Sequence, residues 1–173
     1  VCSSDLVMYD RQDQLLGAVI AGDEQWRFPL STELPEKFVQ SLIHFEDRYF
    51  FYHKGTNYWS VLRAVFQNIH SGQIVSGGST ITMQLVRLKR KKPRTYLEKL
   101  IEIFTAYWLE LKYDKSDLLN MYASHAPFGG NVVGLEAASW RYLGRGMQEL
   151  SWAEAAMLAV LPNSPSLIHP SRN

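Results

Sequence analysis

Apolar residues recur at helical spacing from about residue 35 to residue 161, and this periodicity constrains the fold more than any other feature of the sequence. Glycines and prolines interrupt the pattern at intervals that suit separate helices joined by short loops. The chain has 173 residues, of which 46% are hydrophobic, so it can bury one substantial core. We therefore predict a mainly helical fold and exclude the disordered, collagen-like and coiled-coil classes.

The first thirty residues follow a different pattern. Two β-type runs, at residues 7–9 and 15–20, flank a polar turn, and a third short run covers residues 25–28. We predict a small β hairpin or meander over residues 7–30, before the main domain at 31–162. Residues 1–6 fit neither pattern and are interpreted as a non-native or unassigned leader, and residues 163–173 as a linker cut short.

Capping residues predict where the helices begin and end. Asn57 can cap one helix, which Gly72 would end, and Ser79 can cap the next. A T-x-x-E box begins at Thr95 and an S-x-x-E box at Ser151, each before a further helix. The predicted helical ranges are 35–46, 57–72, 79–88, 100–113, 116–122, 135–142 and 155–161.

Two glutamates are candidates for acid–base chemistry. Glu46 follows an apolar helical face, and burial there would disfavour its charged form, as a general acid or base requires. Glu102 lies three residues after Lys99, so a carboxylate and a cation share one helical face. The alternatives are a solvated helix end at Glu46 and an ordinary surface ion pair at Lys99 and Glu102.

A glycine turn precedes the helix predicted at 79–88. Gly77 and Gly78 stand directly before Ser79 and Thr80, and free N–H groups at such a helix start favour an anion such as phosphate. No G-K-[ST] follows, so the turn is not a Walker loop. The alternative is a glycine turn with an N-cap and no ligand.

A basic segment follows this turn, although the formal net charge of the whole chain is only +1. Its cations are opposed only by Glu98, and they suit phosphates, nucleic acid or an anionic membrane surface, unless the segment is simply a solvated loop. They are Arg87, Lys89, Arg90, Lys91, Lys92, Arg94 and Lys99. Together with two carboxylates, the segment suits glycosyl transfer from a phosphorylated sugar carrier.

Several motifs stand in a recognisable order. They are EDRYFFYHKG (46–55), GGSTITMQ (77–84), EKLIE (98–102) and KSDLLNMYASHAPFGG (115–130), followed by GLEAASWRYLG and SWAEAAMLAVLPNSP. In order and spacing they resemble the glycosyltransferase family 51 domain, the peptidoglycan glycosyltransferase of class A penicillin-binding proteins. The resemblance covers at least residues 25–170, and is strongest to the penicillin-binding protein 1C type.

This resemblance implies a lysozyme-like, two-lobed helical domain that polymerises lipid II into β-1,4 glycan strands, with inversion and release of undecaprenyl pyrophosphate. Glu46 would be the general base that deprotonates the acceptor 4-hydroxyl, and Glu102 the second catalytic carboxylate, in the donor site. Arg87, Arg94 and Lys99 would face the pyrophosphate. The motifs place the remaining predicted substrate-binding residues at Asp47, Arg48, His53, Gly78, Ser79, Thr80 and Gln84.

The resemblance also implies the surroundings of the domain. Its partners would be lipid II, the growing glycan chain, the membrane surface, moenomycin-type inhibitors and other cell-wall proteins, with no nucleic acid. Mg²⁺ or Mn²⁺ assists some family members at the pyrophosphate. We expect a periplasmic location, at the outer face of the bacterial cytoplasmic membrane, with a transmembrane anchor and a transpeptidase region that lie outside this sequence.

The sequence departs from the common family pattern at a few positions. Glu98 and Ile101 stand where many members have basic residues, and Ala123 and Ser124 replace a common Leu-Asn pair. We expect these changes to affect efficiency more than reaction class. Two alternatives stay open from the sequence: a lysozyme-like hydrolase or lytic transglycosylase with Glu46 as acid, and a non-catalytic membrane-surface scaffold.

Overall fold

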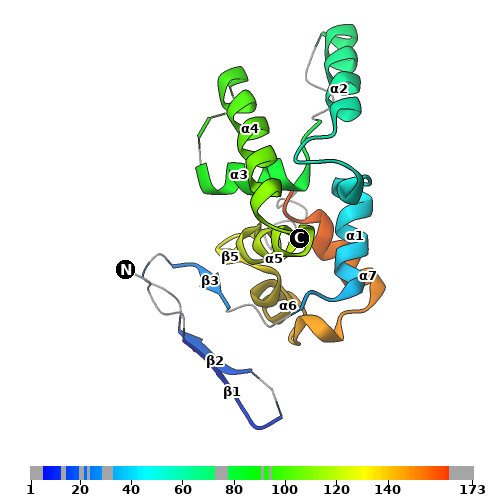
Figure 1. Ribbon diagram of the computed structural model, residues 1–173. Coiled ribbons are helices and arrows are strands. Elements are labelled where there is room, and N and C mark those ends of the chain that lie inside the picture. The colour runs from blue at the N-terminus through cyan, green and yellow to red at the C-terminus, as the bar shows by residue number, and fades with distance from the viewer. Residues whose placement is uncertain are drawn as a thin grey trace. The chain divides into compact units, whose positions relative to one another are not determined.

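A computed structural model divides the chain into two compact units, residues 46–122 and residues 1–45 with 123–173. The structure describes residues 6–12, 15–19, 22, 24–28, 33–72, 78–90, 92–93 and 95–163. Helices predominate, which confirms the predicted mainly helical class with a small β region near the N-terminus (Figure 1). Residues 1–5 of the predicted leader (1–6) and residues 164–173 of the predicted linker (163–173) lie outside the described residues, whereas Leu6 is the first residue of a strand.

The unit of residues 46–122 is built around two packed helices, α3 (Ile81–Arg90) and α4 (Tyr96–Lys112). Met83 and Val86 of α3 and Ala106 of α4 form a buried cluster, against which Ile103 and Leu109 pack. The unit also holds η1 (Phe50–Tyr52), α2 (Tyr58–Ser71) and most of α5 (Lys115–His125). The packed faces of α3 and α4 thus carry apolar side chains at helical spacing.

The ends of α2 follow the prediction, whereas part of its apolar face is exposed. The Asn57 side chain accepts a hydrogen bond from the Ser60 N–H at 3.1 Å, and Gly72 ends the helix in the left-handed region at φ 65°. Leu62 and Phe66, apolar residues at helical spacing, are 58% and 79% exposed. Periodicity identifies an apolar face but does not say what covers it.

Only one of the two predicted capping boxes is complete. Ser151 at the start of α7 (Trp152–Val160) exchanges both hydrogen bonds with Glu154. At α4 the Thr95 side chain accepts the Glu98 N–H at 3.1 Å, but the Glu98 carboxylate pairs with Arg90. The second half of the predicted box at Thr95 is therefore wrong, because a guanidinium competes for the same carboxylate.

The other unit contains two small sheets. β1 (Leu6–Tyr9) and β2 (Leu15–Val19) form the predicted antiparallel hairpin. β3 (Trp26–Arg27) does not extend it, so a three-stranded meander is wrong: β3 pairs in parallel with β5 (Val132–Val133), which pairs antiparallel with β4 (Pro127–Gly129). Figure 1 shows β3 beside β5, although the two strands lie more than a hundred residues apart in the sequence.

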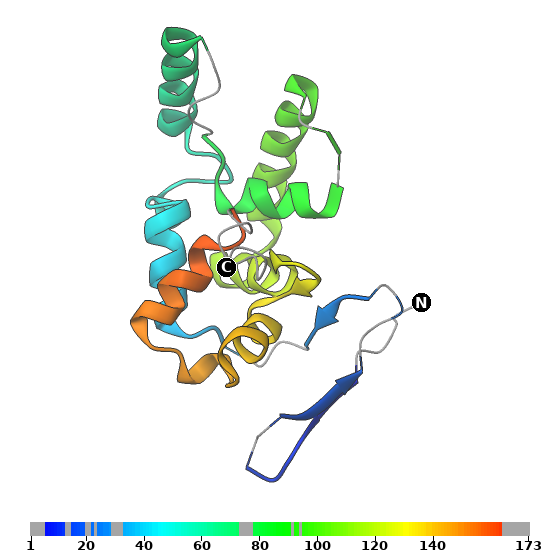
Figure 2. The same ribbon diagram turned by 180° about the vertical axis from the view of Figure 1, so that it is seen from behind.

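Helices complete this unit. α1 (Glu36–Glu46) contributes Phe38, whose ring lies 6.4 Å from that of Phe128, centroid to centroid. α6 (Leu135–Leu143) contacts α7 and η2 (Met147–Glu149), as both views of the model show (Figures 1 and 2). Within the residues described, no helix is both long enough and apolar enough to cross a bilayer.

Candidate active site

Every predicted site residue that the structure describes lies in the unit of residues 46–122. Glu46, the last residue of α1, is half-buried, and its Oε2 accepts a hydrogen bond from Gln84 Nε2 of α3 at 2.7 Å. The alternative of a fully solvated helix end at Glu46 is therefore wrong. A carboxylate held by an amide donor is oriented, which suits a group that must accept a proton from one direction.

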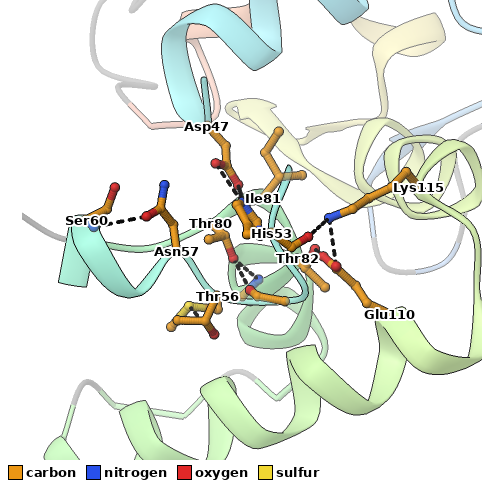
Figure 3. A network of polar contacts seen from close by, with 12 residues as sticks. Asp47, His53, Thr56, Asn57, Ser60, Thr80, Ile81, Thr82, Glu110 and Lys115 are labelled. Atoms are coloured by element: carbon orange, nitrogen blue, oxygen red, sulfur yellow. Dashed lines mark hydrogen bonds and ion pairs between the residues drawn. The ribbon is translucent and has the colours of Figure 1, made fainter. Parts of the chain in front are cut away.

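Asp47, the residue after Glu46, connects the segment that follows α1 to the start of α3 by hydrogen bonds. Asp47 is only 7% exposed, and its Oδ2 accepts the backbone N–H of Ile81 at 3.2 Å (Figure 3). His53 Nε2 donates to the same carboxylate, at 2.9 and 3.0 Å from its two oxygens. Asp47 thus binds the positive end of α3 from inside the unit.

Thr80, rather than the predicted Ser79, caps α3. Thr80 Oγ1 accepts the Met83 N–H at 3.2 Å and donates to the Gly55 carbonyl at 2.6 Å. Because the Asp47 carboxylate also accepts the Ile81 N–H, two N–H groups of the first turn of α3 are paired within the protein. Internal oxygens thus occupy these two donors, and binding of phosphate at this helix start stays a prediction.

The glycine before this turn is explained by close packing. A Cβ on Gly78 would lie 2.7 Å from the Cα of Val61, on α2. Gly55 has φ +72° and a Cβ there would meet the backbone N of Tyr107 at 2.6 Å. Both glycines let neighbouring backbones approach within the unit. Gly77 lies outside the described residues.

Lys99 and Glu102 meet the same turn from α4. Lys99 Nζ donates to Ser79 Oγ at 2.6 Å and lies 3.4 Å from Glu102 Oε2. Glu102 is only 8% exposed, so the alternative of an ordinary surface ion pair is wrong. Both predicted catalytic carboxylates are therefore linked to the segment of residues 79–84: Glu46 directly, through Gln84, and Glu102 indirectly, through Lys99, which donates to Ser79.

A part-buried ion pair joins α4 to α5 beside the start of α3. Lys115 Nζ donates to Glu110 Oε2 at 2.7 Å and to the His53 carbonyl at 2.8 Å (Figure 3). It also lies over the ring of Phe50, 4.2 Å from the centroid. The other Glu110 oxygen accepts from Thr82 Oγ1 at 2.5 Å. Sequence reasoning missed Lys115 and Glu110, although Lys115 opens one of the quoted motifs, because a sequence does not distinguish a lysine paired across two helices from a solvated one.

The basic segment divides into paired and unpaired cations. Arg87 of α3 is half-buried and has no hydrogen bond or ion pair within the described part of the chain. The exposed Arg90 pairs with Glu98, and this hydrogen bond raises the pKa of Arg90 and lowers the pKa of Glu98. Arg48 and Lys89 are exposed, and Arg94 and Lys91 lie outside the described residues. Arg87 is thus the cation best placed to meet an anion.

The described residues do not form a divalent-metal site by themselves. No cluster of three or more His, Cys, Asp or Glu side chains occurs among them. Glu102 already has the Lys99 ammonium as its cation, and Asp47 is used by His53 and Ile81. A metal at the reacting centre would therefore need most of its ligands from the substrate.

Comparisons with known proteins show the family of the chain. The family model described as "Transglycosylase" matches residues 12–173. The chain is 45% identical over 151 residues to penicillin-binding protein 1C of Escherichia coli, which covers 87% of this chain and 20% of that protein. It is 36% identical over 165 residues to penicillin-binding protein 1A of Aquifex aeolicus, covering 94% of this chain and 22% of that protein.

A third relative is also similar over nearly the whole chain. Penicillin-binding protein 4 of Bacillus subtilis is 32% identical over 167 residues, covering 96% of this chain and 27% of that protein. The chain thus spans about a fifth to a quarter of the length of these relatives. It belongs to the transglycosylase family. This confirms the predicted family and the predicted resemblance to the penicillin-binding protein 1C type.

Proposed function

We propose that this unit joins lipid II units into β-1,4 glycan strands and releases undecaprenyl pyrophosphate. The observation that carries the proposal is that both carboxylates are linked to the segment of residues 79–84: Glu46 accepts from Gln84, and Glu102 pairs with Lys99, which donates to Ser79. Two carboxylates linked to one short segment, with an unpaired arginine one turn further along α3, suit transfer of a sugar from a phosphate leaving group.

In this reaction Glu46 takes the proton of the acceptor 4-hydroxyl. The hydroxyl oxygen attacks the anomeric carbon of the donor sugar, a new C–O bond forms with inversion, and the bond to the pyrophosphate oxygen breaks. The pyrophosphate leaves with the bonding electron pair. Gln84 keeps Glu46 oriented during the proton transfer, since its amide donates to one carboxylate oxygen.

Cations near α3 would stabilise the leaving group. Arg87 offers a planar fork of N–H donors, which matches two phosphate oxygens, and Lys99 offers a point charge beside Glu102. Charge-assisted hydrogen bonds of this kind are strongest where charge develops. Arg94 stays a predicted third contact. Contact of Asp47, Arg48, His53 and the 78–80 turn with substrate also stays a prediction, and so does a metal held by the pyrophosphate.

The membrane surface is a proposed partner because α4 exposes an apolar face. The exposed side chains recur at helical spacing, opposite the buried Glu102 and Ala106. They are Tyr96, Leu97, Leu100, Phe104, Tyr107, Trp108 and Leu111. Lys89, Arg90 and Lys92, on or just after α3, are exposed cations that could meet lipid phosphates. This supports contact with a membrane surface, and a location at the outer face of the bacterial cytoplasmic membrane stays a prediction.

Incubation of the chain with lipid II, followed by gel separation of the products, tests the proposal. Polymerised glycan supports it. A chain that leaves lipid II unchanged but cuts finished glycan into muropeptides would be a hydrolase or lytic transglycosylase instead. A folded chain with neither activity would be a scaffold. Competition by a moenomycin-type phosphoglycolipid then reports whether the same site binds the phosphate group.

A further inference from the structure

A short chain of buried hydrogen bonds runs from α5 through α3 to Glu46. Tyr122 of α5 donates its hydroxyl proton to Gln84 Oε1 at an O–O distance of 3.3 Å. The other end of the same amide, Gln84 Nε2, donates to Glu46 Oε2 at 2.7 Å. Tyr122 is 1% exposed and belongs to the same unit as Gln84 and Glu46.

The chemistry of the three groups allows one orientation of the amide. An ionised carboxylate only accepts hydrogen bonds, so the NH₂ of Gln84 must face Glu46. The carbonyl of Gln84 then faces Tyr122 and needs a donor. Burial and the charge of Glu46 raise the pKa of Tyr122, and the smaller opposing effect of Arg87 does not reverse this. The phenol therefore keeps its proton and remains a donor.

Loss of the phenol hydroxyl would leave the amide carbonyl without its buried donor. The amide could then turn and present its oxygen to the Glu46 carboxylate, where two acceptors would meet. A buried acceptor without a partner costs free energy, so the amide would settle in a different position or bind water. In either case, Glu46 would lose its fixed donor.

We propose that Tyr122 is a positioning residue, which fixes the Gln84 amide so that the Glu46 carboxylate is held ready for proton transfer. The inference rests on the proposed function, in which Glu46 is the general base. It adds Tyr122, a residue that sequence reasoning did not select, to the groups that control the reaction.

Tyr122→Phe isolates this role, since the ring that fills the buried site is kept and only the hydroxyl is lost. We expect kcat for lipid II polymerisation to fall roughly 3- to 10-fold, the effect of one neutral hydrogen bond, with KM within twofold of the parent. Tyr142→Phe is the matched control. It removes a hydroxyl that donates to the carbonyls of Phe128 and Gly129 in the other unit, and kcat should stay at the parent value.

A double-mutant cycle separates positioning from general loss of packing. Gln84→Met removes the amide through which Tyr122 acts, so adding Tyr122→Phe to it should lower kcat no further. An equal loss in both backgrounds, or a Tyr122→Phe variant with the kcat of the parent, overturns the inference. Both results require a parent that polymerises lipid II. A parent that makes no polymer refutes the proposed function instead, so the two failures are distinguishable.

Discussion

At the residue scale, the carboxylate of Glu46 is the group whose chemistry is easiest to remove without changing its shape. Glu46→Gln keeps the size of the side chain but replaces the basic oxygen with an amide that cannot take a proton. We expect polymer yield from lipid II to fall about 10²- to 10⁴-fold, the usual effect of losing a general base. Initial rates on labelled lipid II, with thermal unfolding as a check on the fold, measure this.

Glu149→Gln provides the control for this change. Glu149 is an exposed glutamate of η2 in the other unit, and its loss of charge should leave the rate unchanged. Comparable rates for a folded Glu46→Gln variant and the parent would remove Glu46 from the mechanism.

Arg87 is the second residue with a specific expected effect. Its guanidinium has no protein partner within the described part of the chain, so Arg87→Ala should lower turnover and weaken phosphoglycolipid binding by roughly 10- to 100-fold. Arg87→Lys should recover only part of this, because the charge stays but the two-pronged contact is lost. Titration of the chain with a moenomycin-type ligand measures the affinity.

Arg63 on α2 is exposed and offers a matched arginine outside the basic segment. Arg63→Ala should bind the ligand as the parent does. If Arg87→Ala also binds like the parent, the basic segment is a solvated loop and the pyrophosphate assignment is wrong.

At the element scale, the start of α3 depends on Thr80 more than an ordinary helix start depends on its cap. Thr80→Val removes the cap of Met83 and leaves the Gly55 carbonyl without its donor, so we expect a loss of about 2–4 kcal/mol in the free energy of unfolding. Thr95→Val removes an exposed cap alone, and should cost about 1 kcal/mol. Urea unfolding of both variants gives the comparison, and equal losses would contradict it.

The start of α7 predicts a pH dependence. Two hydrogen bonds from Ser151 and an ion pair with Arg145 lower the pKa of Glu154 to about 2. Because the folded pKa lies below the ordinary value of 4.5, this contribution to stability is complete above about pH 4.5 and is lost as the pH falls toward 2. In urea unfolding, the stability difference between the parent and Glu154→Gln should therefore shrink between pH 5 and pH 2. A difference that stays constant over this range would place the stabilisation elsewhere.

The elements show which parts of this fold are local enough to predict. Caps such as Asn57 and Ser151 act on N–H groups within three residues, so the sequence alone locates these helix starts. β3 could not be assigned to its sheet, because a two-residue strand carries no register signal and its partner β5 comes more than a hundred residues later. Glu98 was assigned to a capping box because its competitor, Arg90, lies on another helix.

The candidate site divides in the same way. Glu46 and Glu102 could be selected from their neighbours in the sequence, and Gln84 from a motif that resembles a known family. Other groups near them were missed: Tyr122 contacts Gln84, and the Lys115–Glu110 pair contacts His53 and Thr82, through tertiary contacts that no spacing rule encodes. Thr80 was selected, but as a ligand-binding residue rather than as the cap of α3.

At the scale of the whole molecule, the chain exposes many large apolar side chains that do not pack into its core. In the unit of residues 46–122, Leu97 and Phe104 of α4 are 68% and 72% exposed, and Trp59 and Phe66 of α2 are exposed as well. Large exposed apolar areas mark sites of interaction with proteins or membranes. The formal net charge of +1 does not attract an anionic surface, so binding would have to come from this surface and its neighbouring cations.

Vesicles of a neutral and an anionic phospholipid test this surface. We expect the parent chain to sediment with anionic vesicles, and the double change Leu97→Ser and Phe104→Ser to lower the bound fraction severalfold, because two large apolar contacts with the acyl boundary are lost. The double change Leu16→Ser and Trp152→Ser removes two exposed apolar side chains from the other unit and serves as the matched control. Added salt should weaken binding only in part, since it screens the cations but not the apolar contact. Equal sedimentation of the parent and the α4 variant would show that this face binds something other than lipid.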